Sequence, residues 1–170
     1  MKPQLTEKSE YRVGILADTH GHLNQTVVKR LGNVDLIIHA GDIDSPSVLP
    51  ALEKIAPLVA VRGNMDFGPW AADLPQTETV QVGRTWIYIL HDLSRLDLLP
   101  ESVGFGVVIS GHTHRSQLSR RNGTLYINPG SVTYPRHPAP ASMAFLLIRG
   151  EKTEARLFNL DSDRSYDAPL

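Results

Sequence analysis

Two histidines separated by a single residue follow an apolar run in the second half of the chain. The segment Gly111-His112-Thr113-His114 comes directly after residues 105–110, whose β-branched side chains predict a strand. Two imidazoles this close together can ligate a metal ion, but two surface histidines on a loop give the same pattern. The pair alone leaves both interpretations open. The residues that follow the other predicted strands are needed to choose between them.

An apolar run that stops at a short loop with a metal-capable side chain occurs at five places in this chain. The runs are 13–17, 36–40, 58–61, 86–90 and 105–110. The side chains that follow them are Asp18, His20, Asp42, Asn64, His91, His112 and His114. In open α/β sheets ligands bind beyond the carboxyl ends of the strands, where residues scattered in sequence converge. We therefore predict one site built from five loops.

The composition limits the chemistry of this site. The chain has 170 residues, no cysteine, and 17 basic against 18 acidic side chains. Without cysteine the metal ligands must be oxygen and imidazole, and a thiol nucleophile is excluded. A net charge near zero does not indicate the excess of basic side chains that tight binding to a nucleic-acid backbone requires. Residues 1–10 are polar, and no apolar run approaches the ~20 residues of a membrane span, so we expect a cytoplasmic protein.

The segments between these loops predict β-α-β-α-β in the first half of the chain. Residues 23–31 carry apolar side chains at helical spacing, and Gly32 is placed to end that helix. For the next helix we expect Ser45 at the N-cap and Pro46 at the first helical position, with Pro57 as its end.

After about Gln76 the pattern changes to strands and turns. Residues 79–82 and 85–90 flank a two-residue turn and predict a hairpin. Later strands are expected at 124–128, 143–149 and 153–158. The sum is a sheet-rich α/β sandwich in one domain, 1–170, with residues 1–9 and 161–170 frayed.

Six segments, taken in order, resemble the calcineurin-like metallophosphoesterase superfamily, most of all its small, cap-less bacterial and archaeal phosphodiesterase branch. They are Ala17-Asp18-Thr19-His20-Gly21-His22, His39-Ala40-Gly41-Asp42, Gly63-Asn64-Met65-Asp66, His91, Gly111-His112-Thr113-His114 and Asn128-Pro129-Gly130-Ser131. The resemblance runs from residue 18 to about residue 136, most of the chain. We accordingly expect an α/β/β/α sandwich of four layers, with two mixed sheets and the metal site at the strand carboxyl ends.

The resemblance implies a centre with two divalent metal ions. The expected ligands of the first ion are Asp18, His20 and His114, those of the second are Asn64, His91 and His112, and the bridging ligand is Asp42. The residues expected to be catalytic are Asp42, Asn64 and His112. These donors accept Mn, Fe, Co, Ni or Zn, and we expect Mn²⁺. The implied reaction is hydrolysis of a small phosphoester, chiefly a phosphodiester, by in-line attack of a metal-bridging hydroxide.

Two positions depart from the pattern of the resembled family. Met65 stands where many members have a histidine that assists the leaving group, so we expect good leaving groups to be preferred. Asp92 follows His91 where the branch has glycine. Asp92 could be an additional or supporting ligand, point into solvent, or repel an anionic substrate.

Four further polar residues have two interpretations each. His22 either contacts substrate or belongs to the helix start, and His39, inside an apolar strand, favours a buried hydrogen-bonded role over direct ligation. Asp66 braces either the Asn64 loop or a ligand imidazole. Arg136 either binds phosphate through its planar fork or is simply solvated.

A non-catalytic scaffold on the same fold is the main alternative function. A subunit of the retromer complex resembles this branch and acts chiefly through protein contacts, so fold alone does not decide activity. The intact ligand set favours an enzyme, since a scaffold is expected to lose ligands or to expose large apolar patches. A nucleotide-binding module ranks below both, because the chain has no glycine-rich phosphate loop. The substrate, and whether the chain forms a homo-oligomer, stay open.

Overall fold

The computed structural model describes residues 5, 7–162 and 165–166 of the chain. The α-helices are α1 Gln25–Leu31, α2 Val48–Glu53 and α3 Pro69–Ala72, and two short 3-10 helices are η1 Leu93–Arg95 and η2 Pro100–Val103. The strands are β1 Tyr11–Leu16, β2 Leu36–His39, β3 Leu58–Ala60, β4 Thr77–Val82, β5 Thr85–Leu90, β6 Phe105–Ile109, β7 Gln117–Arg121, β8 Thr124–Asn128, β9 Ser142–Arg149, β10 Lys152–Asn159 and β11 Ser165–Tyr166.

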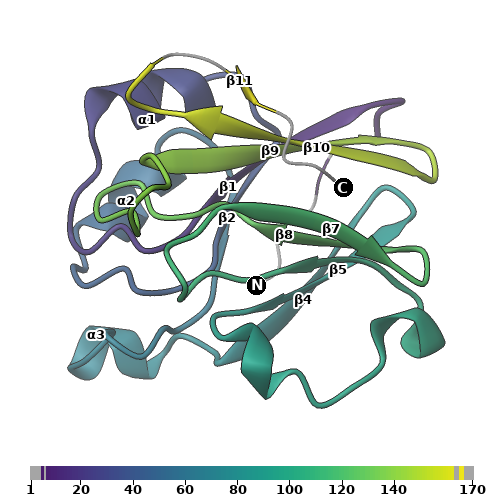
Figure 1. Cartoon of the computed structure of the whole chain (residues 1–170), viewed down its shortest axis with the longest axis horizontal. Coiled ribbons are helices and arrows are strands. Elements are labelled where there is room, and N and C mark those ends of the chain that lie inside the picture. The colour runs from purple at the N-terminus through teal and green to yellow at the C-terminus, as the bar shows by residue number, and fades with distance from the viewer. Residues whose placement is uncertain (1–4, 6, 163–164, 167–170) are drawn as a thin grey trace.

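Two mixed β-sheets lie face to face (Figure 1). The first has the order β11-β10-β9-β1-β2-β3 and the second the order β4-β5-β6-β8-β7. Each sheet contains one run of parallel strands, β1-β2-β3 in the first and β5-β6-β8 in the second. The loops that carry the candidate ligands leave the carboxyl ends of these parallel strands, so the two sheets together form one edge for a site.

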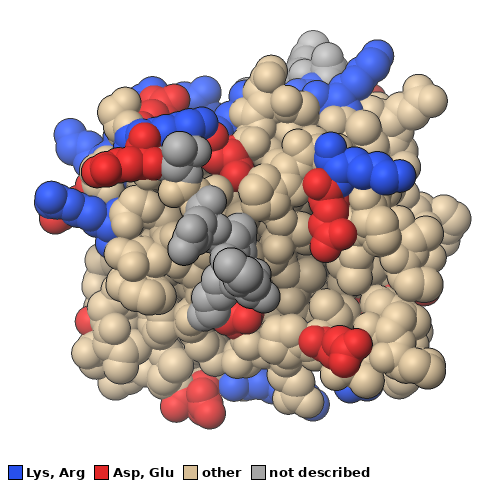
Figure 2. All heavy atoms as spheres, turned by 180° about the vertical axis from the view of Figure 1, so that it is seen from behind, with Lys and Arg blue, Asp and Glu red and all other residues tan. Residues whose placement is uncertain are grey.

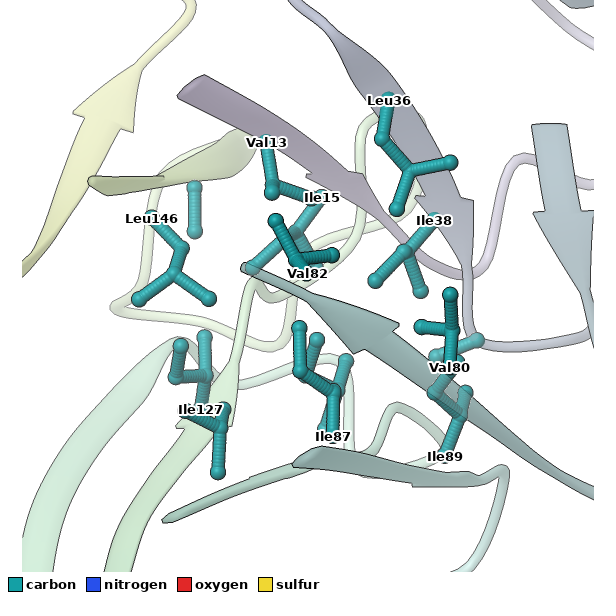
Figure 3. Packing of buried hydrophobic residues seen from close by; sticks show 14 of the residues in the cluster. Val13, Ile15, Leu36, Ile38, Val80, Val82, Ile87, Ile89, Ile127 and Leu146 are labelled. Atoms are coloured by element: carbon teal, nitrogen blue, oxygen red, sulfur yellow. The ribbon is translucent and has the colours of Figure 1, made fainter. Parts of the chain in front are cut away.

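Branched aliphatic side chains from both sheets form the central core. Val13, Ile15 and Leu146 of the first sheet point toward Ile87 and Ile127 of the second (Figure 3). All five are at most 1% exposed. Alternation along each strand sends every second side chain into this layer, and on β1 and β2 the other side chains pack under the helices, which is why these strands appear in the sequence as unbroken apolar runs.

The outer faces of the two sheets are covered differently. Helices α1 and α2 pack their buried residues, among them Val27, Leu31 and Leu52, on the first sheet. The outer face of the second sheet, around Tyr88, is covered by segments that contain the 3-10 helices. The expected sandwich of four layers is therefore confirmed, and its layer over the second sheet is built from short turns instead of long helices.

Several element boundaries differ from the sequence-based expectation. Helix α1 begins only at Gln25, because the Asn24 side chain accepts a hydrogen bond from the Val27 N–H and caps the helix there. The expected cap at Ser45 with Pro46 as first helical residue is wrong, since α2 begins at Val48 after a separate turn. Helix α3, strand β7 and strand β11 were not expected. Helix α3 and strand β11 have only four and two residues, and short elements give weak periodicity. Strand β7 is as long as β8, but its sequence contains a single apolar residue, Leu118.

Most of the terminal segments expected to be frayed lie outside the described residues, namely 1–4, 6, 163–164 and 167–170. Of the rest, Ser165–Tyr166 pair with β10, and Leu5 packs against the central core. On the face drawn in Figure 2, basic and acidic side chains are intermixed. Over the described residues, no helix has the length and apolar character needed to cross a membrane.

Candidate metal centre

The candidate ligands meet because the loops after the parallel strands are hydrogen-bonded to one another. The N–H groups of Asp18 and His20 donate to the carbonyls of Gly41 and Asp42, and the Gly111 N–H donates to the His91 carbonyl. The loops are also unusual in conformation. Positive φ angles occur at Asp18, His20, Asp42, Asp44, His112 and His114, with values from 45° to 70°. Residues other than glycine adopt this region rarely, and such strain concentrates at functional sites.

Four side chains form what we term the first cluster: Asp18, His20, Asp42 and His114. Each offers one ligand atom, and these atoms all lie within 4.8 Å of one another. The Nε2 atoms of His20 and His114 are 3.2 Å apart, and His114 Nε2 is 3.3 Å from Asp18 Oδ1. Two carboxylates and two imidazoles converging on one point suit a divalent cation.

The second cluster consists of Asp42, Asn64, His91 and His112. The Asn64 Oδ1 atom lies 3.0 Å from His91 Nε2 and 2.9 Å from His112 Nδ1. His91 Nε2 is also 3.3 Å from Asp42 Oδ2. Asp42 is thus in contact with both clusters, as a bridging carboxylate must be, and all seven side chains expected from the sequence are brought together.

Backbone and carboxylate acceptors fix which nitrogen of three imidazoles faces the centre. His91 Nδ1 donates to the Ala40 carbonyl at 2.7 Å, and His114 Nδ1 donates to the Tyr134 carbonyl at 2.6 Å. His20 Nδ1 is 2.8 Å from Asp44 Oδ2. In each case the outer N–H is held, which leaves Nε2 as the inward ligand atom. His112 differs, since its Nδ1 is the atom that faces Asn64.

The buried charges of the centre perturb one another. Burial alone would raise the pKa of Asp42, but hydrogen bonds from His91 and the Met65 N–H outweigh it and hold that pKa below its ordinary value. Burial would lower the pKa of His91, but the Asp42 carboxylate outweighs it and raises that pKa. For His114, the hydrogen bond with Asp18 is the main reason for a raised pKa. His91 and His114 are thus each electrostatically coupled to the carboxylate beside them.

Two glycines allow the ligand loops to approach closely. A Cβ at Gly63 would lie 2.1 Å from Asp42 Oδ1 and 2.2 Å from the Asp42 backbone nitrogen. At Gly41, where φ is +91°, a Cβ would lie 2.7 Å from His91 Nδ1. No side chain fits at either distance, so the Gly-Asp and Gly-Asn motifs are required by packing as much as by chemistry.

Asp66 ties the loops of the two clusters together. Its carboxylate accepts hydrogen bonds from four backbone N–H groups, those of Asp42, Ile43, Asp44 and Gly63, at 2.7–3.1 Å. The residue is fully buried. Of the two roles considered for Asp66, it therefore braces the Asn64 loop, and it braces the Asp42 loop as well.

Asp44 is a component of the site that sequence reasoning missed. Its Oδ2 holds His20 Nδ1, while its Oδ1 is buried without a hydrogen-bond partner among the described residues. A carboxylate behind a ligating histidine fixes the ring and raises its basicity. The spacing Gly41-Asp42-Ile43-Asp44, with a second acid two residues after the first, was the available signal.

The segment Asn128-Pro129-Gly130-Ser131, one of the six motifs of the family resemblance, is hydrogen-bonded to two ligand loops. The Asn128 side-chain amide donates to the Gly111 carbonyl at 2.7 Å, and Ser131 Oγ donates to the Asp18 carbonyl at 2.8 Å. Thr133 Oγ1 adds a bond to the Thr19 carbonyl at 2.9 Å. The first cluster is therefore held from the side of β8 as well as from its own strands.

His39 lies beneath the centre. It is completely buried, and burial, followed by the nearby His91 charge, lowers its pKa to about 3. Its Nδ1 accepts from the Gly41 N–H, which leaves Nε2–H to donate to Thr19 Oγ1 at 2.9 Å. Both ring nitrogens are used within the protein, in keeping with the buried, hydrogen-bonded role.

The remaining candidates lie at the rim. Asp92 caps η1 by accepting from the Ser94 N–H and hydroxyl. Its φ is −105°, an extended conformation that needs no glycine at this position. The His22 ring lies edge-on to the Tyr134 ring, with centroids 6.4 Å apart. His22 is not the helix cap, because Asn24 takes that position. The Arg136 side chain is exposed, and the backbone N–H of Arg136 donates to the His114 carbonyl.

Comparison with known proteins gives the class of this fold and site. A family model described as the calcineurin-like phosphoesterase superfamily domain matches residues 11–151. A probable metallophosphoesterase of Methanocaldococcus jannaschii is 35% identical over 162 residues, which cover 88% of this chain and 81% of the relative. A phosphodiesterase of the same organism is 30% identical over 138 residues, covering 70% and 82%.

A solved structure of Vacuolar Protein Sorting 29 from Cryptosporidium parvum superposes with a TM-score of 0.78 at 20% identity, covering 94% of this chain and 96% of that one. At this identity the likeness concerns the fold alone. The family model and the archaeal relatives are stronger evidence, because they match in sequence over most of the chain. The chain therefore belongs to the calcineurin-like phosphoesterase superfamily.

Proposed function

We propose that the chain is a phosphodiesterase that uses two divalent metal ions and hydrolyses its substrate by in-line attack of water-derived hydroxide. The observation that carries the proposal is the position of Asp42, which belongs to the first cluster and whose Oδ2 also lies 3.3 Å from His91 Nε2 of the second. The 30% identity to an archaeal phosphodiesterase supports the same reaction class.

The donor set fits two such ions. It offers two carboxylates, four imidazoles and one amide oxygen, and outer hydrogen bonds hold three of the imidazoles with Nε2 turned inward. When bound, a pair of ions supplies Lewis acidity and lowers the pKa of water toward neutrality. Two aspartates against two dications would leave the centre positively charged, which favours a phosphate anion. Ions of the Mn, Fe, Co, Ni or Zn type suit these donors, and Mn²⁺ is our proposal.

The residues around the centre have separate tasks in this reaction. Asp42 would bridge the ions, and Asn64 and His112, both exposed, would face the phosphoryl group. Met65, which is 46% exposed beside Asn64, offers no proton to a leaving group. We therefore propose that esters of acidic alcohols react faster than alkyl phosphomonoesters, by the roughly 10²–10⁴-fold that a general acid contributes elsewhere.

A scaffold role would not require this ligand set. Seven ligand-type side chains, four backbone hydrogen bonds to the buried Asp66 carboxylate and six residues with positive φ are present at this centre, which supports catalysis. Exposed apolar side chains such as Phe67 and Tyr134 do occur near the centre, so the scaffold is kept as the outcome of a failed activity test.

The test is hydrolysis of bis-p-nitrophenyl phosphate by metal-stripped protein to which Mn²⁺, Co²⁺, Ni²⁺ or Zn²⁺ is returned. We expect activity with at least one ion, none without metal, and a loss on the order of 10³-fold in Asp42→Ala, since Lewis-acid stabilisation is worth several kcal/mol. Inactivity with all four ions would support the scaffold. An alkyl phosphomonoester that reacts as fast as the diester would contradict the leaving-group argument.

A further inference from the structure

A cleft opens from the second cluster and extends away from the metal centre. Its volume is about 540 Å³, and Asn64, His91 and His112 line its inner end. Tyr88 and Leu90, at most 8% exposed on the outer face of β5, also line it. A phosphate group at the ions would leave this space empty, so the cleft has room for a substituent of the phosphate.

One side of the cleft carries a carboxylate with unused acceptor capacity. Asp92 Oδ1 accepts from the Ser94 N–H at 3.0 Å and from the Ser94 hydroxyl at 2.8 Å, which fixes the group. Asp92 Oδ2 forms an ion pair with Arg95, which also lines the cleft, but Arg95 Nε is 4.0 Å away and outside hydrogen-bonding range. Among the described residues no donor reaches Oδ2, so this oxygen can accept from a ligand.

Arg62 also lines the cleft and carries free donors. Its Nε donates to the Asp66 carbonyl at 3.2 Å, and its backbone N–H donates to the Pro75 carbonyl at 2.7 Å. The guanidinium is thereby anchored, and its terminal nitrogens make no hydrogen bond within the part of the chain that is described. A fixed acceptor, a fixed donor and an apolar surface are what a hydroxyl-rich ring needs for binding.

We propose that this cleft binds a sugar ring of the phosphodiester, with Asp92 Oδ2 accepting from its hydroxyl groups and Arg62 donating to its oxygens. The proposal rests on the proposed function, because the ester must reach the second cluster. It also gives Asp92 a role: its carboxylate accepts hydrogen bonds and donates none, so it selects for a ligand group that carries a donor, such as a hydroxyl.

The experiment compares two substrates that differ only in two hydroxyls, uridine 5′-(p-nitrophenyl phosphate) and its 2′,3′-dideoxy analogue. In the wild-type protein we expect kcat/KM to be about tenfold higher for the uridine ester, the size of one hydrogen bond to a charged group. Asp92→Asn keeps the cap acceptor and removes the charge, and it should abolish most of this preference. Asp73→Asn, an exposed aspartate at the end of α3, is the matched control and should retain it.

Three outcomes would overturn the proposal: equal kcat/KM for the two esters, an unchanged preference in Asp92→Asn, or an equal loss in Asp73→Asn. Methyl p-nitrophenyl phosphate is the control for the proposed function, because it has no sugar. If the cleft proposal alone is wrong, the protein still hydrolyses this ester; if the proposed function is wrong, it does not. Calorimetric binding of uridine 5′-monophosphate and its dideoxy analogue to the metal-loaded protein tests the cleft without turnover. Metal content measured in Asp92→Asn must equal that of the wild type, because His91 is its neighbour.

Discussion

The first cluster is more acidic and more enclosed than the second. Asp18 is fully buried, and the side chains of His20 and His114 are only 14% and 15% exposed. Apart from the shared Asp42, the second cluster has neutral donors only, and Asn64 and His112 are exposed beside the cleft. A cation gains more from two carboxylates than from one, so we expect the first ion to bind tightly and the second to exchange and to face the substrate.

The largest effect that can test this comparison is the loss of one histidine from each cluster. We expect His114→Ala to lose the first ion, His112→Ala to lose the second, and both to lose about 10³-fold in kcat/KM, since one Lewis acid is worth several kcal/mol. Metal content per chain, measured by elemental analysis, should fall from two ions to one in each variant.

Double variants identify which ion is lost. A chain with His112→Ala and Asn64→Ala should still bind one ion, because both changes lie in the second cluster. A chain with His112→Ala and His114→Ala should bind none tightly. If both double variants bind equally, the two clusters are not separate sites.

Asp66→Asn should affect both clusters together. The buried carboxylate is replaced by an amide whose NH₂ faces backbone donors, which costs about 3 kcal/mol in the free energy of unfolding. The midpoint of urea unfolding measures the loss, with Asp73→Asn as the exposed control. Metal affinity that falls in one cluster only would contradict a shared brace.

A smaller and one-sided effect is expected from Asp44→Asn. Without the carboxylate behind His20, the affinity of the first ion should fall about 10–100-fold, the usual consequence of losing such a partner. The second ion should bind as before. Calorimetric titration with Mn²⁺ resolves the two affinities, and equal weakening of both would show that Asp44 only stabilises the fold.

The smallest effect concerns a carboxylate outside the centre. Burial would raise the pKa of Asp35, but hydrogen bonds from the Lys8 side chain and the Arg12 N–H outweigh it and lower that pKa below 3.8. A lowered folded-state pKa stabilises the protein above pH ~4, and this contribution is lost as pH falls further. Asp35→Asn should cost at most about 1 kcal/mol at pH 7, with the difference shrinking in acid and metal affinity unchanged.

Local periodicity accounts for most of the fold. The strands of the parallel runs and the hairpin across Gly83-Arg84 appear where the sequence predicts them. The parallel strands are buried on both faces and therefore form continuous apolar runs, and the hairpin has a two-residue turn. The start of α2 was misplaced. Ser45 and Pro46 are residues typical of a helix start, but in the structure they belong to the turn that follows Asp44, which has a positive φ. A helix start depends on the preceding backbone, which sequence pattern does not describe.

The sequence by itself determined the identity and order of the seven candidate ligands, since each follows a strand whose hydrophobic pattern is local. Tertiary structure decided how they act together: that Asp42 lies between the clusters, that His112 presents Nδ1 while His20, His91 and His114 present Nε2, and that Asp44 supports His20. Ring orientation is set by acceptors on other strands, and Asp92 faces a cleft only because β5 and its neighbours pack that way. Such contacts join residues far apart in the chain, so no local pattern contains them.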